Sequence, residues 1–446
     1  MPTRLRNLVR YSVCVAIALA SCPVFCANFA DVYQLAVAQD PVLQSARSQR
    51  GAAGQEKAIA LADYLPQFGM QVERSETVQD VLSTDNLVFT SGKANYPSTN
   101  YTATLSQAIV DMGAFSNIKR SLAAIEAADA ELIQVEQDLV LRTAEAYFAV
   151  LAAQDQLSYV QAEKASVRQN LELVQAQHQS GLARITDLRD AEARYATVLS
   201  SESEARNDLY AAQLTLEEII GSSSEQLSPL LEEFEPTRPQ PDDVNTWLQV
   251  GVETNPTVLS RRKQLEAARH EVDRLQAGHY PEIGFEARYD RNDARGSLYG
   301  GGSEVETVKY AFQLRVPVLA GGRVYAQVKQ AAELLERARS EVDRAQRDVK
   351  RRTETSFVGI ESAIARVQAM TKAVEAQELA RTAKDESYRS GLLTLIAVLD
   401  AERDLFIARA DLARAKYDFI LESLRLEQAA GSLDSEDVSR VNAWLQ

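Results

Sequence analysis

The sequence predicts an α+β membrane protein made of long helices and a few short strands, with one such unit present twice. Prolines and glycines are absent from Ala114 to Ser180, so this stretch can form one very long helix. Four short segments alternate apolar and polar residues with the period of a β-strand. Segments of the first half also recur in the second half, about 210 residues later, which indicates an internal two-fold repeat.

The first 27 residues have the pattern of a secretory signal peptide. Three arginines precede a short apolar run at 11–20, and small residues follow it. A membrane-spanning helix would need about 20 apolar residues, roughly twice the length of this run. We therefore expect cleavage after Ala27 and export of the chain.

The three cysteines all lie in this leader, so the exported chain would have no disulfide or thiol chemistry. The segment "LASC", which ends at Cys22, resembles a bacterial lipoprotein cleavage site, and a lipid on Cys22 is the alternative to simple cleavage. Without the leader, 48 basic residues fall to 45 against 63 acidic ones, a net charge of −18. Such a surface repels nucleic acid, and we expect no nucleic-acid partner.

The two copies of the repeat match in order along most of the chain. "AVAQDPVLQSA" at 36–46 is echoed by "GVETNPTVLSR" at 251–261, and "YLPQFG" at 64–69 by "HYPEIG" at 279–284. "SGLARITDLRDAE" at 180–192 likewise matches "SGLLTLIAVLDAE" at 390–402. We expect a first repeat at 28–240 and a second at 241–446, each with a helix, two strands and a long helical hairpin.

The helical hairpins are predicted from apolar residues spaced by three or four positions, which is the spacing of coiled-coil packing. In the first unit these residues are Ile118, Leu122, Ile125, Ala128, Leu132, Val135 and Leu139. The equivalent positions of the second unit, 210 residues later, run from Val328 to Val349. The hairpin tips are expected at 180–187 and 390–397, where serine and glycine interrupt the pattern.

The strands are expected at about 67–78, 99–109, 282–291 and 306–317. About ten residues is the length of a tilted strand that crosses a bilayer. A soluble sandwich with its apolar faces inward is the alternative. Aromatic residues on the apolar face and charged residues on the other favour a membrane barrel with a water-filled lumen. No later segment has 18 consecutive apolar residues, so a chain that crosses a membrane would have to do so as a barrel. Four strands cannot close a barrel, so several copies of the chain are required.

With these repeated segments, strands and helical hairpins, the chain resembles the TolC-like outer-membrane efflux channels. The resemblance extends over nearly the whole exported chain and includes "YLPQFG", "TAEAYFAVLAAQDQLSY", "VPVLAGGRVYAQVKQA" and "YRSGLLTLIAVLDAERDLFIARADLARAKYDFI". It implies a homotrimer with a 12-stranded transmembrane β-barrel, four strands from each chain, continued by a long coiled-coil α-helical barrel. It also implies a place in the outer membrane of a Gram-negative bacterium, in contact with its lipid and extending into the periplasm.

The resemblance implies a transport function and the partners that go with it. Such a channel is the exit duct of a tripartite efflux pump or a type I secretion system, and it conducts drugs, small molecules or proteins passively. A periplasmic adaptor protein would connect it to an inner-membrane transporter of the RND, MFS or ABC type. The alternative is a periplasmic coiled-coil adaptor or interaction protein. The residues show no catalytic pattern, so we expect neither an enzyme nor a cofactor.

The resemblance also implies roles for residues near the two tips. Thr186, Asp187 and Tyr388 match residues that latch neighbouring coils shut at the periplasmic entrance. Asp400 matches an aspartate that forms an acidic ring there, where three copies near one axis would attract cations.

Gly181 and Gly391 match the tip glycines at which the adaptor docks. Without the resemblance, a glycine between two helices is ordinarily a helix stop. An aspartate near a helix start is ordinarily an N-cap or a solvated charge. Tyr388 alone would be taken for a packing residue.

The sequence departs from the family at two of these positions. Leu393 stands where the family has the arginine of the latch, so the latch is weaker here or is completed by another basic residue. Ala397 stands where the family has a second acidic ring, which weakens the expectation of cation block. The basic residues near the tips are Arg184, Arg189 and Arg389.

Overall fold

The computed structural model describes residues 27–83, 92–223, 226–231, 233–297 and 301–445. The expected signal peptide lies outside these residues except for Ala27, and so does the alternative lipidation site at Cys22. The helices are α1 (Phe29–Gln39), α2 (Pro41–Ala62), α3 (Met112–Gln179), α4 (Ile185–Ile220), α5 (Val244–Thr254), α6 (Pro256–Gln276), α7 (Arg323–Arg389), α8 (Leu395–Ala430) and α9 (Ser435–Ala443), with a 3₁₀ turn, η1 (Ala277–His279), after α6. The strands are β1 (Gln67–Val81), β2 (Gly92–Val110), β3 (Glu282–Ala294) and β4 (Ser303–Arg315).

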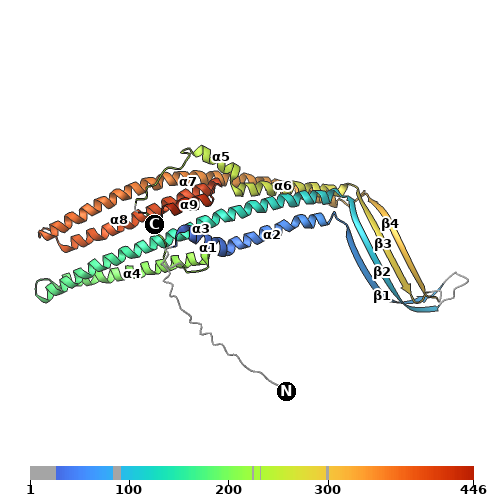
Figure 1. Ribbon diagram of the computed structural model, residues 1–446, viewed down its shortest axis with the longest axis horizontal. Coiled ribbons are helices and arrows are strands. Elements are labelled where there is room, and N and C mark those ends of the chain that lie inside the picture. The colour runs from blue at the N-terminus through green and yellow to red at the C-terminus, as the bar shows by residue number, and fades with distance from the viewer. Residues whose placement is uncertain (1–26, 84–91, 224–225, 232, 298–300, 446) are drawn as a thin grey trace, which may run out of the picture.

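The chain is elongated, with two helical hairpins at one end and a sheet at the other (Figure 1). Helix α3 has 68 residues and is therefore roughly 100 Å long at 1.5 Å per residue. It pairs with α4, and α7 pairs with α8, while α3 and α8 join the two hairpins along their length. No helix in the described part of the chain carries an apolar stretch long enough to cross a membrane.

The two helices that lead to the sheet, α2 and α6, each begin with an N-cap residue followed by a proline. The Asp40 carboxylate accepts a hydrogen bond of 2.6 Å from the Leu43 N–H, and the Asn255 side chain accepts one of 2.9 Å from the Thr257 N–H. The proline that follows each cap occupies the first turn, where its missing N–H costs nothing. The chain therefore ends a short helix and begins a longer one at equivalent dipeptides in both halves, Asp40-Pro41 and Asn255-Pro256.

The sheet is antiparallel in the order β1-β2-β3-β4, and the pairing of β2 with β3 joins the two halves of the chain. The strands are longer than the alternation suggests. Pairing continues to Val81 opposite Gly92, beyond the strands expected at about 67–78 and 99–109, and residues 84–91 lie outside the described part. Strand β4 ends at Arg315 rather than at 317, in keeping with the lack of an N–H on Pro317.

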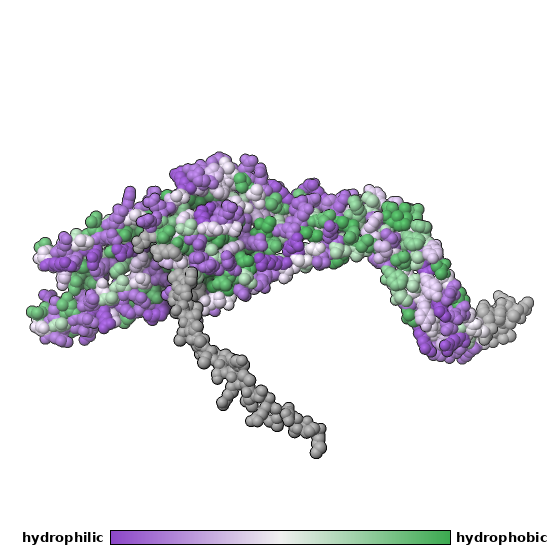
Figure 2. Space-filling view, viewed as in Figure 1, coloured by the Kyte–Doolittle hydropathy of each residue, from purple (hydrophilic) through white to green (hydrophobic). Residues whose placement is uncertain are grey.

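One face of this sheet is apolar and has no cover from its own chain. Cross-strand pairing places Phe68, Leu105, Ala287 and Tyr310 in a single row on that face. Phe68 is 68% exposed and Tyr310 is 73% exposed. Figure 2 shows hydrophobic residues gathered where the sheet meets the helices and hydrophilic residues toward its far end. The apolar band thus covers only part of the strand length.

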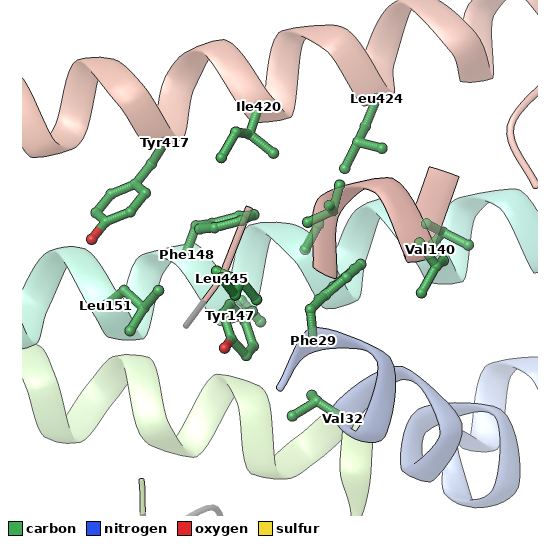
Figure 3. Close-up of a cluster of buried hydrophobic side chains, with 14 of the residues drawn as sticks. Phe29, Val32, Val140, Tyr147, Phe148, Leu151, Tyr417, Ile420, Leu424 and Leu445 are labelled. Atoms are coloured by element: carbon green, nitrogen blue, oxygen red, sulfur yellow. The ribbon is translucent and has the colours of Figure 1, made fainter. Parts of the chain in front are cut away.

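The main core lies midway along the helices, where the chain start and α9 pack onto the hairpins (Figure 3). The rings of Tyr147 and Phe148 in α3 are centred 5.7 Å and 6.5 Å from that of Phe29 in α1. Phe148 also stacks on Tyr417 of α8 at 5.4 Å. The Tyr147 hydroxyl donates a 2.8 Å hydrogen bond to the carbonyl of Ser228, which satisfies its polar end inside the core.

Short pairings complete a belt around this core. Ala27 forms a parallel bridge with Leu227, and Leu230 forms an antiparallel bridge with Leu445. These two bridges hold the segment after α4 against the residues before α1 and against the segment that follows α9. Away from the sheet and the core, the hairpin tips are the part of the fold where the functional residues were expected.

Candidate functional site

The two hairpin tips have the same backbone geometry. Gly181 and Gly391 adopt φ angles of 75° and 80°, a left-handed conformation that costs glycine no steric penalty. The amide after each glycine donates to a carbonyl in the last turn of the helix, Leu182 to Gln177 at 2.8 Å and Leu392 to Ser387 at 2.9 Å. A Cβ on either glycine would meet open space, so the backbone angle and not crowding requires glycine there. These glycines end the helices, as sequence reasoning without the resemblance also suggested.

Asp187 is a capping residue of α4 in this chain. It accepts a 3.2 Å hydrogen bond from the Arg184 N–H and a 3.4 Å bond from the Thr186 hydroxyl. A carboxylate in the first turn also interacts favourably with the helix dipole. The equivalent position of α8 is Ala397, so the second tip has no such cap. Thr186 and Asp187 both remain exposed.

Tyr388 is half-buried at the end of α7. Among the described residues, no hydrogen bond or ion pair joins it to Thr186 or Asp187 within one chain. Two of the basic residues considered for the latch are already paired along their own helices, Arg189 with Glu192 at 2.7 Å and Arg389 with Asp385 at 2.9 Å. The guanidinium of Arg184 makes no ion pair in the described part of the chain.

Asp400 is joined to a residue that sequence reasoning missed. Arg194 of α4 donates a 2.6 Å hydrogen bond to its carboxylate and forms an ion pair across the two hairpins. Glu163 of α3 lies beside the same arginine. Burial raises the pKa of Glu163, while the charges of Arg194 and Arg403 act to lower it. Arg194 and Asp400 are 206 positions apart in the sequence, and no local pattern links them.

Farther from the tips, a second polar contact joins the hairpins at the seam between α3 and α8. The Tyr417 hydroxyl donates a 2.8 Å hydrogen bond to Asp155. Burial raises the pKa of Asp155 and also that of Tyr417, which has Asp155 as a charged neighbour. Tyr159 and Phe406 stack between these two contacts, so the seam alternates polar and aromatic pairs.

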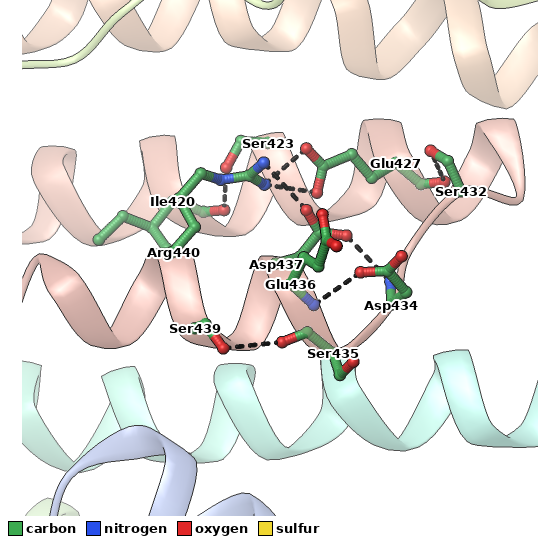
Figure 4. Close-up of polar contacts among 10 residues, drawn as sticks. All are labelled: Ile420, Ser423, Glu427, Ser432, Asp434, Ser435, Glu436, Asp437, Ser439 and Arg440. Atoms are coloured by element: carbon green, nitrogen blue, oxygen red, sulfur yellow. Dashed lines mark hydrogen bonds and ion pairs between the residues drawn. The ribbon is translucent and has the colours of Figure 1, made fainter.

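A third cluster of charges attaches α9 to α8 (Figure 4). The Arg440 guanidinium donates hydrogen bonds of 2.5 Å and 2.6 Å to Glu427 and pairs with Asp437 at 2.9 Å. Burial of Glu427, with the Asp437 carboxylate next to it, raises the pKa of Glu427 to about 7. Asp437 also accepts a 2.9 Å hydrogen bond from the Asp434 N–H, which fixes the start of α9.

No group of three or more histidine, cysteine, aspartate or glutamate side chains in the described residues could hold a metal ion. Two of the charged pairs described above, Arg194–Asp400 and Arg440–Glu427, instead connect one helix to another. The chain thus has an exposed apolar sheet face at one end and charged hairpin tips at the other, with helices as long as α3 between them (Figure 1).

Comparisons with known proteins identify the class of protein. The model of the outer membrane efflux protein family matches residues 32–222 and 247–432, and the chain belongs to that family. The outer membrane protein TolC of Vibrio cholerae is 29% identical over 445 residues, which cover 99% of each chain. The alkaline protease secretion protein AprF of Pseudomonas aeruginosa is 30% identical, over 94% of this chain and 87% of that protein. The crystal structure of the Campylobacter jejuni CmeC outer membrane channel aligns with a TM-score of 0.80 at 15% identity, over 100% of this chain and 98% of that one.

The family assignment confirms the expected resemblance and the expected function. The protein is an outer-membrane efflux channel of the TolC-like group, and it extends into the periplasm. The alternative of a periplasmic adaptor is disfavoured, because the family model is that of a channel and covers both halves of the chain. The channel fold is likewise shared with CmeC, including a mostly helical body and a small antiparallel sheet.

Proposed function

We propose that three copies of the chain close one 12-stranded transmembrane β-barrel, with four strands from each. The observation that carries this proposal is the open sheet. Each outer strand, β1 and β4, has one neighbouring strand among the described residues, and both carry exposed apolar side chains. A sheet with free edges is stable in lipid only when those edges pair. A symmetric ring of three chains joins β4 of one copy to β1 of the next.

In this trimer the helices form a tunnel through the periplasm. Two hairpins in each of three chains give six tips around one axis, and the internal repeat supplies the six quasi-equivalent units. Thr186, Asp187 and Tyr388 latch neighbouring hairpins in the closed state, and Asp400 lies at the entrance. The family arginine is replaced by Leu393, so we assign the remaining basic contact of the latch to Arg184.

The tips are also the docking surface for a periplasmic adaptor protein. Leu182 and Leu392, next to the tip glycines Gly181 and Gly391, are 83% and 79% exposed. Apolar side chains exposed at the end of a helical hairpin suit a protein partner. The adaptor connects the channel to an inner-membrane RND, MFS or ABC transporter. The similarity to AprF, a protease secretion protein, supports an additional role in type I secretion.

The proposal is tested by isolating the protein from outer membranes and measuring its size and conductance. We expect a trimer that survives mild heating in detergent and forms discrete channels in planar bilayers. Cysteines placed at facing positions of β1 and β4 should crosslink only between chains. Recovery of a soluble periplasmic monomer without conductance would refute the proposal.

A further inference from the structure

The acidic residue expected at the channel entrance already has a cationic partner in its own chain. Arg194 and Asp400 are 2.6 Å apart, and their side chains are 22% and 41% exposed. The Arg194 side chain is therefore the more buried of the two. The pair bridges α4 of the first hairpin and α8 of the second, in the part of the hairpins nearest the tips.

The surrounding charges leave Arg194 as the main counter-charge of Asp400. Glu163 of α3 faces the same guanidinium from the third helix. The positive charge of Arg403 also attracts the Asp400 and Glu163 carboxylates at longer range, but its guanidinium donates hydrogen bonds of 3.0 Å and 3.3 Å to Asp404.

We propose that Arg194 sets the charge of the entrance by neutralising Asp400. This inference rests on the proposed trimeric channel, in which this level of the tunnel presents three ion pairs instead of three free carboxylates. The entrance then attracts cations weakly, even though Asp400 occupies the position of an acidic ring. Arg194 is therefore a selectivity-determining residue that acts through Asp400.

The physical basis is the strength of charge interactions at short range. Two unit charges about 4 Å apart interact by about 1 kcal/mol in water and by more near a protein surface. Loss of the arginine would leave three carboxylates around one axis, and their fields add at a divalent cation on that axis. A divalent cation gains the same energy in water at about 8 Å from one carboxylate, which corresponds to about a fivefold tighter block for each carboxylate that is freed.

The test is Mg²⁺ block of the channel in planar bilayers, with Mg²⁺ added on the side of the helical tips. Arg194→Gln should lower the half-blocking Mg²⁺ concentration about fivefold or more relative to the wild type. Arg194→Lys keeps the positive charge and should retain wild-type block. The double variant Arg194→Gln with Asp400→Asn also lacks the ion pair but has no free carboxylate at this position, so its block should return to the wild-type value.

The matched control is Arg168→Gln. Arg168 pairs with Glu172 one turn along α3, both side chains are well exposed, and the variant removes the same net charge without contact to Asp400. Equal block in Arg194→Gln and the wild type would overturn the inference. Tight block that persists in the double variant would do so too, because it would assign the cation site to Glu163. Absence of any wild-type conductance would overturn the proposed channel and this inference together.

Discussion

Raising the pH should loosen helix α9 from α8, because Glu427 carries a proton more readily when α9 is docked than when it is free. Burial in the interface and the neighbouring Asp437 raise the pKa of Glu427 from 4.5 to about 7. The Glu427 carboxyl therefore makes its full contribution to the docking free energy of α9 below about pH 4.5, and this contribution is lost as the pH rises through about 7. The pair with Arg440 offsets part of the cost of the buried charge but not all of it.

The size of the effect follows from the two pKa values. A change from 4.5 to about 7 is worth about 3 kcal/mol of docking free energy at 1.36 kcal/mol for each pH unit. The equilibrium for opening of α9 should therefore increase by a factor on the order of 300 between acidic and mildly alkaline pH. Replacement by glutamine keeps the shape of the side chain and removes the titration.

Hydrogen exchange of the peptide that contains 435–443 measures this opening in the intact protein. At about pH 8 the amides of this peptide should exchange faster in the wild type than in Glu427→Gln, because α9 opens more often in the wild type. At about pH 5 the exchange rates of the two proteins should become equal. Comparison at equal pH removes the intrinsic pH dependence of exchange. Glu436→Gln is the matched control, because Glu436 is an exposed acidic residue of α9 itself. The same pH response in the wild type and in Glu427→Gln would refute the reasoning.

Three further predictions concern the latch, the core and the leader. Tyr388→Phe combined with Asp187→Ala should raise single-channel conductance, and an unchanged conductance would count against the latch. Phe148→Ala should destabilise the protein by about 3–5 kcal/mol through a cavity beneath Phe29, seen as a lower unfolding temperature; a wild-type temperature would contradict this role. Mass spectrometry should find the mature N-terminus at Asn28; a lipid-modified Cys22 would establish the alternative cleavage site.

The secondary structure was largely predictable because its signals are local. The absence of proline and glycine from Ala114 to Ser180 indicated one long helix, and α3 spans Met112–Gln179. Alternation of apolar and polar residues indicated the strand that begins at Glu282. The two tips were visible as a shared Ser-Gly-Leu motif, and a left-handed glycine ends the helix at each of them.

The strand lengths were less predictable. Polar residues around Asp80 and Lys93 look like loop, yet they pair in the ladder. A backbone ladder requires only that two extended segments face each other, and it can continue where side-chain alternation fades.

The sequence by itself determined the class of protein, the helices and strands, and the identity of the residues at the tips. Only the tertiary structure decided which charges meet. Arg194 and Asp400 come together because the long Arg194 side chain reaches from α4 to the carboxylate on α8, and the environment of Glu427 exists only where α9 folds back on α8. Local patterns arise from backbone geometry within a few residues, whereas the charge that a carboxylate presents depends on burial and on partners that the fold brings from distant parts of the chain.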